Sequence, residues 1–264
     1  MDLGIRGEAA LVVGASEGIG FESAKALAEE GARVFICSRN EDKLSAAAAR
    51  ITAATGAPVA WFAADITKAD EAAALSGWIA RRVPALDILV SAVGGSHRAL
   101  FEDLDDETWL GSYNFNVLGA VRVIRGTLEL LKRAASGGRI VLLGAAGARM
   151  PYPNQVVSNV SKAALIALVK TLGAEFHKHS IRVNSVSPGR TLTPLWIGRA
   201  EKLARERGTT PEAILHEFTE EIPMQRFGRP EETAAMVTFL ASHKASYVTC
   251  QSILVDGGIA RGLV

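Results

Sequence analysis

The chain has 264 residues, of which 48% are hydrophobic, and its 29 basic and 28 acidic residues leave a formal net charge of +1. A chain of this length can bury roughly three quarters of the surface that its unfolded form exposes, so it can form a core without disulfides or a metal. The mixed charges include no basic block of the kind that binds nucleic acid or an anionic membrane. Of the two cysteines, Cys37 lies in an apolar run, which is typical of a small buried side chain and gives no sign of an oxidising compartment.

The first residues, MDLGIRGEAA, lack the basic start and the apolar stretch of a signal peptide. No uninterrupted apolar run reaches the roughly 18 residues that a membrane span needs. No repeat, low-complexity stretch or linker divides the chain. We therefore expect one cytoplasmic domain over residues 1–264, with no membrane or nucleic-acid partner.

Short β-branched runs alternate with longer helical patterns along the chain. In the first half the pattern predicts strands at 8–16, 32–38, 58–64 and 86–91, and helices at 18–30, 41–55 and 68–82. In the second half it predicts helices at 106–133 and 154–178, strands at 139–144, 181–187 and 252–258, an irregular, partly helical insertion at 191–222, and a helix that opens at 228–232. Pro230 suits the first turn of that helix, where a missing N–H costs little.

The predicted strands are apolar on both faces and are separated by helices. This arrangement is typical of a parallel sheet that is covered on each side. Because crossovers between parallel strands are right-handed, few topologies remain, and the doubly wound one is the commonest. The pattern therefore predicts a single α/β domain of the doubly wound Rossmann type, with ligands bound beyond the carboxyl ends of the strands.

The sharpest local signal is the segment GASEGIG at 14–20, which leaves a predicted strand and opens a predicted helix. That context is the one a dinucleotide-binding turn requires. Gly14 permits the tight turn, Gly18 lets the backbone approach a diphosphate, and Gly20 lets the helix pack close to the sheet. The helix N-terminus offers free N–H groups and a partial positive charge to phosphates. We expect cofactor contacts from Gly14, Ser16, Glu17, Gly18, Ile19 and Gly20; the simpler alternative is a turn that needs glycine for its shape alone.

The end of the second strand discriminates between the two nicotinamide cofactors. An NAD site usually carries an acid there, which holds the ribose hydroxyls. This chain has Ser38 and Arg39 instead, and a hydroxyl with a guanidinium suits a 2′-phosphate. Glu17 argues mildly the other way, because its carboxylate lies in the loop near that phosphate. The sequence therefore predicts NADP(H), with NAD as the alternative cofactor and an ordinary surface arginine as the alternative role of Arg39.

Further segments have the spacing of one known family. They are Asp65-Ile66 after the third strand, Ser91-Ala92-Val93-Gly94 after the fourth, Asn116 in Asn-Val-Leu-Gly, Pro188-Gly189 followed by Thr191 and Thr193, Gly228-Arg229-Pro230-Glu231-Glu232, and Asp256-Gly257-Gly258. Together with 14–20 they resemble the short-chain dehydrogenases/reductases, over about residues 7–259, and most of all the 3-oxoacyl-carrier-protein-reductase-like group. The resemblance implies adenine contacts from Asp65 and Ile66, cofactor contacts from Ala92 and Gly94, and a nicotinamide cover from Pro188, Gly189, Thr191 and Thr193.

The catalytic pattern of that family is only partly present. The family uses a tyrosine four residues before a lysine, which lowers the pKa of the phenol and binds the nicotinamide ribose, and a serine thirteen residues before the tyrosine. Here the matching lysine is Lys162, the tyrosine position holds Ser158, and the serine position holds Ala145. Asn116, which resembles the family's water-relay asparagine, remains. The tyrosine position of the enoyl-reductase branch, seven residues before the lysine, holds Gln155.

Three interpretations of this site stay open. The chain can be a reductase of a small to medium, partly apolar carbonyl or alcohol substrate, in which Ser158 binds the carbonyl or a proton passes through water from Lys162. A second tyrosine can serve as the proton donor: Tyr152, in a loop before the lysine helix, or Tyr113, one turn before Asn116. Alternatively, the fold keeps its cofactor with changed chemistry, as in imine or alkene reduction, dehydration or isomerisation, or acts as a non-catalytic partner subunit.

The remaining features place the substrate and the assembly. Residues 191–222 contain an apolar cluster and form the expected substrate lid, although a lid that packs on its own core would look the same. His97 lies in a loop that is expected to border the cleft. No cluster has metal-ligand spacing, so no catalytic metal is predicted. On resemblance alone, the helices at 106–133 and 154–178 are the pair that would form a homodimer or homotetramer.

Overall fold

The computed structural model describes residues 2–262. Within them, seven parallel strands form one sheet in the order β3-β2-β1-β4-β5-β6-β7. The strands are β1 (Ala9–Val13), β2 (Arg33–Ser38), β3 (Ala60–Ala63), β4 (Ile88–Ser91), β5 (Arg139–Leu143), β6 (Arg182–Pro188) and β7 (Ser252–Val255). The order reverses between β1 and β4, as in a doubly wound sheet. The predicted α/β fold of the Rossmann type is confirmed.

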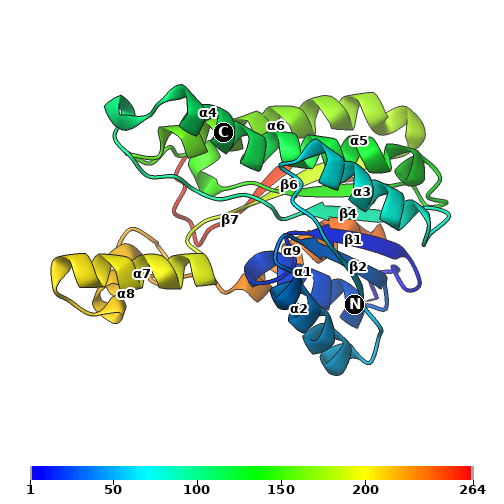
Figure 1. Ribbon diagram of the computed structural model, residues 1–264, viewed down its shortest axis with the longest axis horizontal. Coiled ribbons are helices and arrows are strands. Elements are labelled where there is room, and N and C mark those ends of the chain that lie inside the picture. The colour runs from blue at the N-terminus through cyan, green and yellow to red at the C-terminus, as the bar shows by residue number, and fades with distance from the viewer. Residues whose placement is uncertain (1, 263–264) are drawn as a thin grey trace.

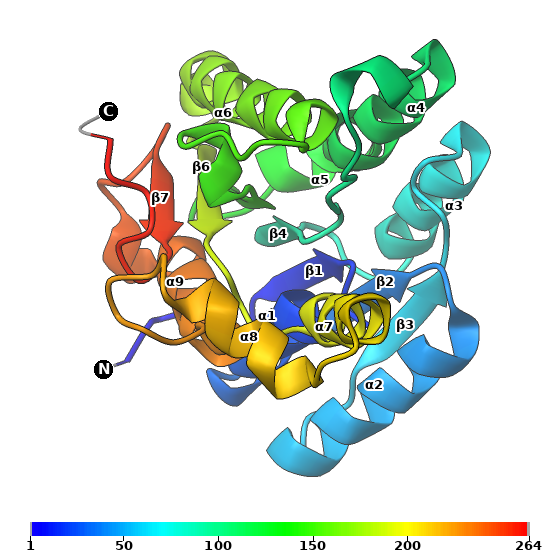
Figure 2. The same ribbon diagram turned by 90° about the vertical axis from the view of Figure 1, so that its left-hand side faces the viewer.

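Helices cover both faces of this sheet. They are α1 (Gly18–Glu29), α2 (Glu41–Thr55), α3 (Ala69–Ala80), α4 (Asp106–Tyr113), α5 (Gly119–Lys132), α6 (Val156–Phe176), α7 (Pro194–Arg207), α8 (Pro211–Thr219) and α9 (Pro230–Ala241). Helices α3 to α6 lie on one face, and α1, α2 and α9 lie on the other (Figure 1). Helices α7 and α8 lie beyond one end of the sheet, in front of the strands in the turned view (Figure 2).

The sheet has a separate apolar core on each face. All five residues of β1 are buried, and successive side chains point to opposite faces. Leu11 belongs to the buried cluster that includes Leu75 of α3, whereas Val12 belongs to the cluster that includes Leu27 of α1. Burying a side chain of this size stabilises the fold by about 1.5–3 kcal/mol relative to exposing it. This two-sided burial is the reason why the strands read as continuous apolar runs.

The prediction of one helix over 106–133 is wrong in one respect. Helix α4 ends at Tyr113, a wider π-helical turn occupies Asn114–Leu118, and α5 begins at Gly119. The side-chain amide of Asn116 donates to the carbonyl of Ser112 at 3.1 Å. That carbonyl is the acceptor that the backbone N–H of Asn116 would use in an α-helix, so the side chain competes with the helical hydrogen bond. Such turns recur at functional sites.

Three strands are clearly shorter than predicted. Strand β1 covers Ala9–Val13 of the expected 8–16, β3 covers Ala60–Ala63 of the expected 58–64, and β7 ends at Val255 instead of continuing to residue 258. Gly257 and Gly258 adopt φ angles of 64° and 84°. This left-handed conformation is incompatible with a strand, so the glycines that looked like the end of β7 form a turn.

The insertion at 191–222 folds into α7 and α8. Each helix has a proline in its first turn, Pro194 in α7 and Pro211 in α8, where the missing N–H leaves no helical bond unmade. The hydroxyl of Thr210 accepts from the backbone N–H of Ala213 at 3.2 Å and caps α8. The two helices also share a small buried cluster of their own, formed by Ala200, Ala204 and Ile214.

By length and composition alone, one helix of the described residues, Val156–His179, could cross a membrane. Its side chains Leu165 and Val169 belong to the buried cluster that also contains residues of α3 and α5. The core helix of an ordinary α/β protein has a similar length and composition, so a single such helix is a weak sign of a membrane span.

Candidate active site

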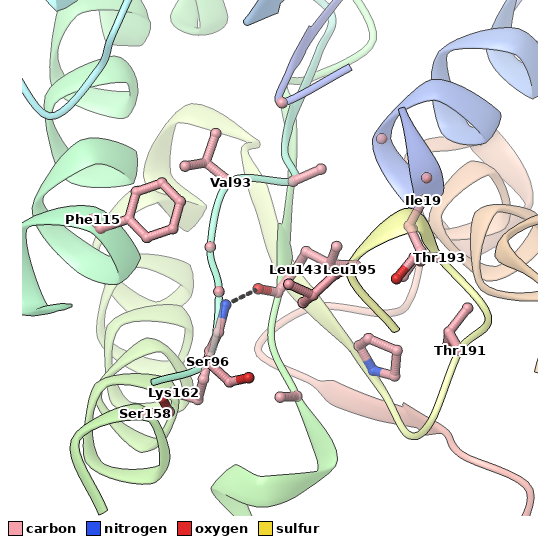
Figure 3. A pocket seen from close by; sticks show the side chains of 18 of the residues that line it. Ile19, Val93, Ser96, Phe115, Leu143, Ser158, Lys162, Thr191, Thr193 and Leu195 are labelled. Carbon is pink, nitrogen blue, oxygen red and sulfur yellow. Dashed lines mark hydrogen bonds between the residues drawn. The ribbon is translucent and has the colours of Figure 1, made fainter. Parts of the chain in front are cut away.

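A cavity of about 380 Å³ lies beyond the carboxyl ends of the strands, where β1 and β4 diverge. Ligands of doubly wound sheets bind at this switch point. In Figure 3, Val93 and Phe115 lie on one side of the cavity, and Ile19, Thr191 and Thr193 lie on the other. Every residue that the sequence assigns to the cofactor lines it: Gly14, Ser16, Glu17, Gly18, Ile19, Gly20, Ser38, Arg39, Asp65, Ile66, Ala92, Gly94, Lys162, Pro188, Gly189, Thr191 and Thr193.

The glycine-rich turn forms a cradle of backbone with no room for a side chain at Gly14 or Gly20. Gly14 and Gly18 adopt left-handed φ angles of 84° and 60°, which favour glycine. A Cβ on Gly20 would lie 2.1 Å from the carbonyl oxygen of Gly14. Helix α1 begins here with no side-chain cap, so its first N–H groups are free to bind an anion. The cradle therefore fits the diphosphate of a dinucleotide.

The helix that follows β6 adds a second wall to the phosphate end. A Cβ on Gly18 would lie 3.4 Å from the side chain of Thr193. Thr193 is the N-cap residue of α7 and makes no capping hydrogen bond with its side chain. The hydroxyls of Thr191 and Thr193 and the first turn of α7 therefore face the same space as the first turn of α1.

The charged groups at the adenosine end balance one another. The Glu17 carboxylate is 3.0 Å from the ammonium of Lys43, so the acid that argued against a 2′-phosphate has a cation beside it. The guanidinium of Arg39 lies 5.3 Å from the ring centroid of Phe115, across the cavity from β2. Lys43 was missed by sequence reasoning, because nothing in the spacing of α2 shows that it reaches the glycine-rich turn.

Asp65 is held as a carboxylate at the end of β3. Its Oδ1 atom accepts from the backbone N–H of Thr67 at 3.0 Å and from the Thr67 hydroxyl at 2.7 Å. Partial burial opposes the charge, but these bonds and the attraction of Arg39 and Lys68 together hold the pKa of Asp65 below its usual value. A fixed acceptor at this place suits the amino edge of an adenine.

Lys162 is buried at the opposite end of the cavity. Its Nζ atom donates to the carbonyl oxygen of Leu143 at 3.1 Å (Figure 3). Burial lowers the pKa of Lys162 to about 8, because the charged form has lost its water and gained no carboxylate. A Cβ on Gly94 would lie 2.4 Å from Nζ and 2.9 Å from Oδ1 of Asn116. Gly94 therefore allows the lysine and the asparagine to approach the backbone after β4.

Asn116 does not face the cavity but holds in place the loop that lines it. It is buried in the π-helical turn, and its Oδ1 atom accepts from the backbone N–H of Gly95 at 3.0 Å. With its amide nitrogen bound to Ser112, the side chain fixes the loop after β4 against α4. Its position next to Gly94 brings it close to Lys162, although it does not line the cavity.

Ser158 lies one helical turn before Lys162 and lines the cavity, but the backbone of His97 engages its hydroxyl. Oγ accepts from the N–H of His97 at 2.7 Å and lies 3.3 Å from the His97 carbonyl, to which it can donate. The serine therefore anchors the loop after β4. His97 takes part through its backbone, because its side chain is not among the lining groups. Ala145 also lines the cavity and offers no hydroxyl.

The structure separates the two candidate tyrosines. Tyr152 lines the cavity, and burial raises the pKa of its phenol. Tyr113 is 43% exposed and lies outside the lining. The sequence placed Tyr113 one helical turn before Asn116; in the structure the π-helical turn begins directly after Tyr113, and Asn116 is buried whereas Tyr113 is exposed. Of the two tyrosines, only Tyr152 can meet a ligand in this cavity.

Three lining arginines were missed by sequence reasoning: Arg98, Arg190 and Arg199. They come from the loop after β4, the segment after β6 and helix α7, so only the fold brings them together. The available signal for the first two was their place after recognised glycines: Arg98 lies four residues after Gly94, and Arg190 directly follows Gly189. In residues 2–262, no group of three or more His, Cys, Asp or Glu side chains is arranged to hold a metal ion.

Comparisons with known proteins agree with this architecture. The family described as Enoyl-(Acyl carrier protein) reductase matches residues 14–260. The 2,3-dihydro-2,3-dihydroxybenzoate dehydrogenase of Bacillus subtilis is 31% identical over 98% of each chain. A putative ketoacyl reductase of Streptomyces coelicolor is 32% identical over 96% of this chain and 97% of its own.

A solved structure is similar over the whole length. It is the L-sorbose reductase of Gluconobacter frateurii in complex with NADPH and L-sorbose, with a TM-score of 0.96, 34% identity and full coverage of both chains. The family matches nearly all of the chain, two relatives are more than 30% identical to it, and a solved structure shares its fold. The chain belongs to the short-chain dehydrogenase/reductase family of oxidoreductases.

Proposed function

We propose that the chain is an NADP(H)-dependent oxidoreductase that interconverts a small to medium, partly apolar carbonyl compound and its alcohol. The observation that carries this proposal is the gathering of all the assigned cofactor residues and Lys162 around one cavity at the β1–β4 switch point. The solved L-sorbose reductase complex, which contains NADPH, supports the choice of cofactor.

In this proposal, three groups of residues would bind three parts of the cofactor. The turn at 14–20 and the first turns of α1 and α7 hold the diphosphate. Ser38 and Arg39 bind the 2′-phosphate, with Asp65 and Ile66 at the adenine. Gly94, Lys162 and the segment Pro188-Gly189 border the nicotinamide end. When bound, NADPH supplies a hydride to the carbonyl carbon, and the carbonyl oxygen must then receive a proton.

Lys162 is the proton donor that fits the site best. An effective acid has a pKa near the working pH, and the burial that lowers the pKa of Lys162 to about 8 meets this condition. The hydroxyl of Ser158 is bound to the His97 backbone, so it serves as an anchor that keeps the loop near the lysine. The ammonium delivers its proton to the substrate oxygen directly or through one water. Tyr152 is the second candidate donor.

Helices α7 and α8 form the substrate lid in this proposal. Leu195 and Trp196 line the cavity, while Ala200, Ala204 and Ile214 keep the lid folded as a unit. Leu143 and Phe115 extend the apolar lining on the other walls. An apolar wall beside the buried lysine would exclude bulk water from the reacting carbonyl.

Reduction of an activated alkene or an imine is the second candidate function. Ala145 and Ser158 replace the hydroxyl groups that usually hold a ketone oxygen in this family, and these substrates need less help from an acid. The family description, which names an enoyl reductase, favours the alkene. Dehydration, isomerisation or a non-catalytic partner role would be indicated by cofactor binding without any redox turnover.

A cytoplasmic homodimer or homotetramer completes the proposal. Apolar side chains that are exposed on α4 and α6, namely Leu110 at 71% and Val160 at 50%, support self-association through these helices. Light scattering of the wild type and of a Leu110→Glu, Val160→Glu double variant would measure it. A smaller assembly for the double variant is expected, and an unchanged mass would contradict this interface.

The experiment that tests the function is NADPH oxidation with a panel of ketones, enones and imines, measured from pH 6 to pH 10 (about two units on either side of the lysine pKa). The proposal expects turnover of at least one ketone, with activity that falls above about pH 8. Turnover confined to enones or imines would favour the second candidate. Binding of NADPH without turnover on any class would contradict the oxidoreductase function.

A further inference from the structure

The lid end of the cavity is lined by three guanidinium groups from separate parts of the chain. Arg98 comes from the loop after β4, Arg190 from the segment after β6, and Arg199 from α7. Arg190 pairs with Glu221 and also donates to the carbonyl of Phe218. Within residues 2–262, no carboxylate lies within ion-pair distance of Arg98 or Arg199. Two positive charges therefore have no acidic partner.

These charges repel one another. Burial and the repulsion from Arg98 and Arg190 lower the pKa of Arg199 to about 10. Partial burial and the charge of Arg190 also lower the pKa of Arg98, and the attraction of the Glu221 carboxylate, which is already paired with Arg190, opposes this only in part. The acids that line the cavity, Glu17 and Asp65, belong to its adenosine end. The lid end thus holds an excess of positive charge that an anion would relieve.

The guanidinium groups are held in place by aromatic rings. Arg199 lies 4.7 Å from the ring centroid of Trp196, and Arg190 lies 4.8 Å from that of Phe218. Stacking restrains the plane of a guanidinium and leaves N–H groups at its edge for a planar oxyanion. Arg98 lines the cavity and is exposed, and its guanidinium lies 5.9 Å from the ring centroid of Phe218. It makes no hydrogen bond to the described residues, so its donors are available.

The same arginines lie near the reaction end. Arg199 Nη2 donates to the Ser96 hydroxyl at 2.8 Å, which bridges the lid to the loop after β4. Ser96 is two residues from Gly94, which packs against Lys162, and it adjoins His97, which binds Ser158. A substrate whose carbonyl faces Lys162 would therefore present its far end to the arginines. The cofactor's own phosphates are accounted for at α1 and at Arg39, in the other half of the cavity.

We propose that the substrate carries an anionic group, a carboxylate or a phosphate, which Arg98 and Arg199 bind while Arg190 adds a longer-range attraction. The inference rests on the proposed function, because it names the substrate class of the same site. The charge-assisted pairs expected here are stronger than neutral hydrogen bonds. They would orient the carbonyl toward Lys162 by fixing the opposite end of the substrate.

The test compares charged and neutral ketones of similar shape. Acetoacetate is paired with its ethyl ester, and dihydroxyacetone phosphate with dihydroxyacetone. Each is titrated by calorimetry into the complex of the protein with NADP⁺, in which the ketone cannot be reduced. We expect at least one anionic ketone to bind about tenfold or more tightly than its neutral partner. The pair that shows the preference identifies the carboxylate or the phosphate as the recognised group.

Three variants assign the preference to its residues. Arg98→Met and Arg199→Met keep an unbranched side chain and remove its charge, and each is expected to reduce the preference by about tenfold. Arg199→Lys keeps the positive charge but lacks the planar, two-pronged donor group of a guanidinium. It is expected to retain part of the anion preference that Arg199→Met loses. Arg205→Met is the matched control, because Arg205 is exposed on the same helix and lies outside the cavity lining.

Several results would overturn the inference. Equal binding within both pairs, absence of binding by all four ketones, or a preference that survives the Arg98→Met, Arg199→Met double variant would each contradict it. If the wild type fails to bind NADP⁺ and NADPH, the proposed function is wrong and the inference falls with it. Cofactor affinity that is normal in wild type and variants, without an anion preference, contradicts the inference alone.

Discussion

The two halves of the cavity are built by different means. The phosphate half consists mainly of backbone: Gly14, Gly18 and Gly20 shape it, and two uncapped helix N-termini face it. The reaction half consists of side chains from distant segments, with Lys162 under the apolar wall and Arg98 and Arg199 at the lid. The first half has the glycine spacing that resembles the family pattern, whereas in the proposed function the second half works without the family's tyrosine.

This difference shows which part of a cofactor enzyme can vary. A diphosphate is the same in every relative, and the N–H groups and small residues that hold it have few substitutes. A proton donor has several, provided that its pKa lies near the working pH. In the proposed function, a lysine that burial brings to a pKa of about 8 takes the role of the family's phenol. Fold and cofactor would then be retained while the group that supplies the proton changes.

Removing the lysine would break the reaction half and should have the largest effect. We expect Lys162→Met to lower kcat by about 10²–10⁴, the usual contribution of a positioned acid, and to weaken NADPH binding to a smaller extent. Steady-state kinetics and a fluorescence titration measure the two effects. Lys170→Met, an exposed lysine two turns later on α6, is the control. Turnover as fast as that of the wild type would remove Lys162 from the mechanism.

Reversing a charge in the phosphate half should alter cofactor choice without touching the reaction half. Arg39→Asp is expected to raise the dissociation constant of NADPH by about 10- to 100-fold, because a charge-assisted bond to the 2′-phosphate becomes a repulsion. The dissociation constant of NADH should change much less. Arg33→Asp, at the exposed start of the same strand, provides the comparison. Equal losses for both cofactors would refute the role of Arg39.

The pH dependence of reduction separates Lys162 from Tyr152. A lysine pKa lowered to about 8 leaves the ammonium present below that pH and lost above it, so kcat for reduction should fall about tenfold per pH unit beyond 8. Burial raises the pKa of Tyr152 above its usual value, so a tyrosine donor would keep its proton through this range. A flat profile up to pH 10, together with inactivity of Tyr152→Phe, would assign the proton to the tyrosine.

The smallest expected effect is at the mouth of the phosphate half. Glu17→Gln removes a carboxylate that neutralises Lys43, and we expect NADPH to bind about two- to fivefold more tightly as a result. Both groups are exposed, so added salt should shrink the gain. Titrations at low and high salt would measure it. Weaker binding of NADPH by the variant would mean that Glu17 itself holds the ribose.

The fold could be predicted from the sequence because its determinants are local. Strands buried on both faces must be apolar throughout, as β1 is, and the glycine spacing at 14–20 has few uses other than a tight turn under a phosphate. The site was harder to predict. The hydroxyl of Ser158 is bound to the backbone of His97, which lies 61 residues away in sequence, and no helical spacing reveals that contact.

Two other features were invisible for similar reasons. The π-helical turn at Asn114–Leu118 contains a side-chain hydrogen bond from Asn116 to the carbonyl of Ser112, and apolar periodicity does not reveal such a bond. In the sequence, each arginine of the lid end looks like an ordinary surface residue in a loop or on a helix. Only the crossover connections, which bring the ends of β4 and β6 and helix α7 together, make them neighbours.

The measurement that tests the central claim most directly is a fluorescence titration of the wild-type protein with NADPH and, separately, with NADH. The account predicts that both reduced cofactors bind in the cavity at the β1–β4 switch point, with NADPH at least about tenfold tighter because of the charge-assisted bond at Arg39. Equal affinity for the two would contradict the assignment of the 2′-phosphate site. Absence of binding by either would contradict the nicotinamide-dependent oxidoreductase function itself.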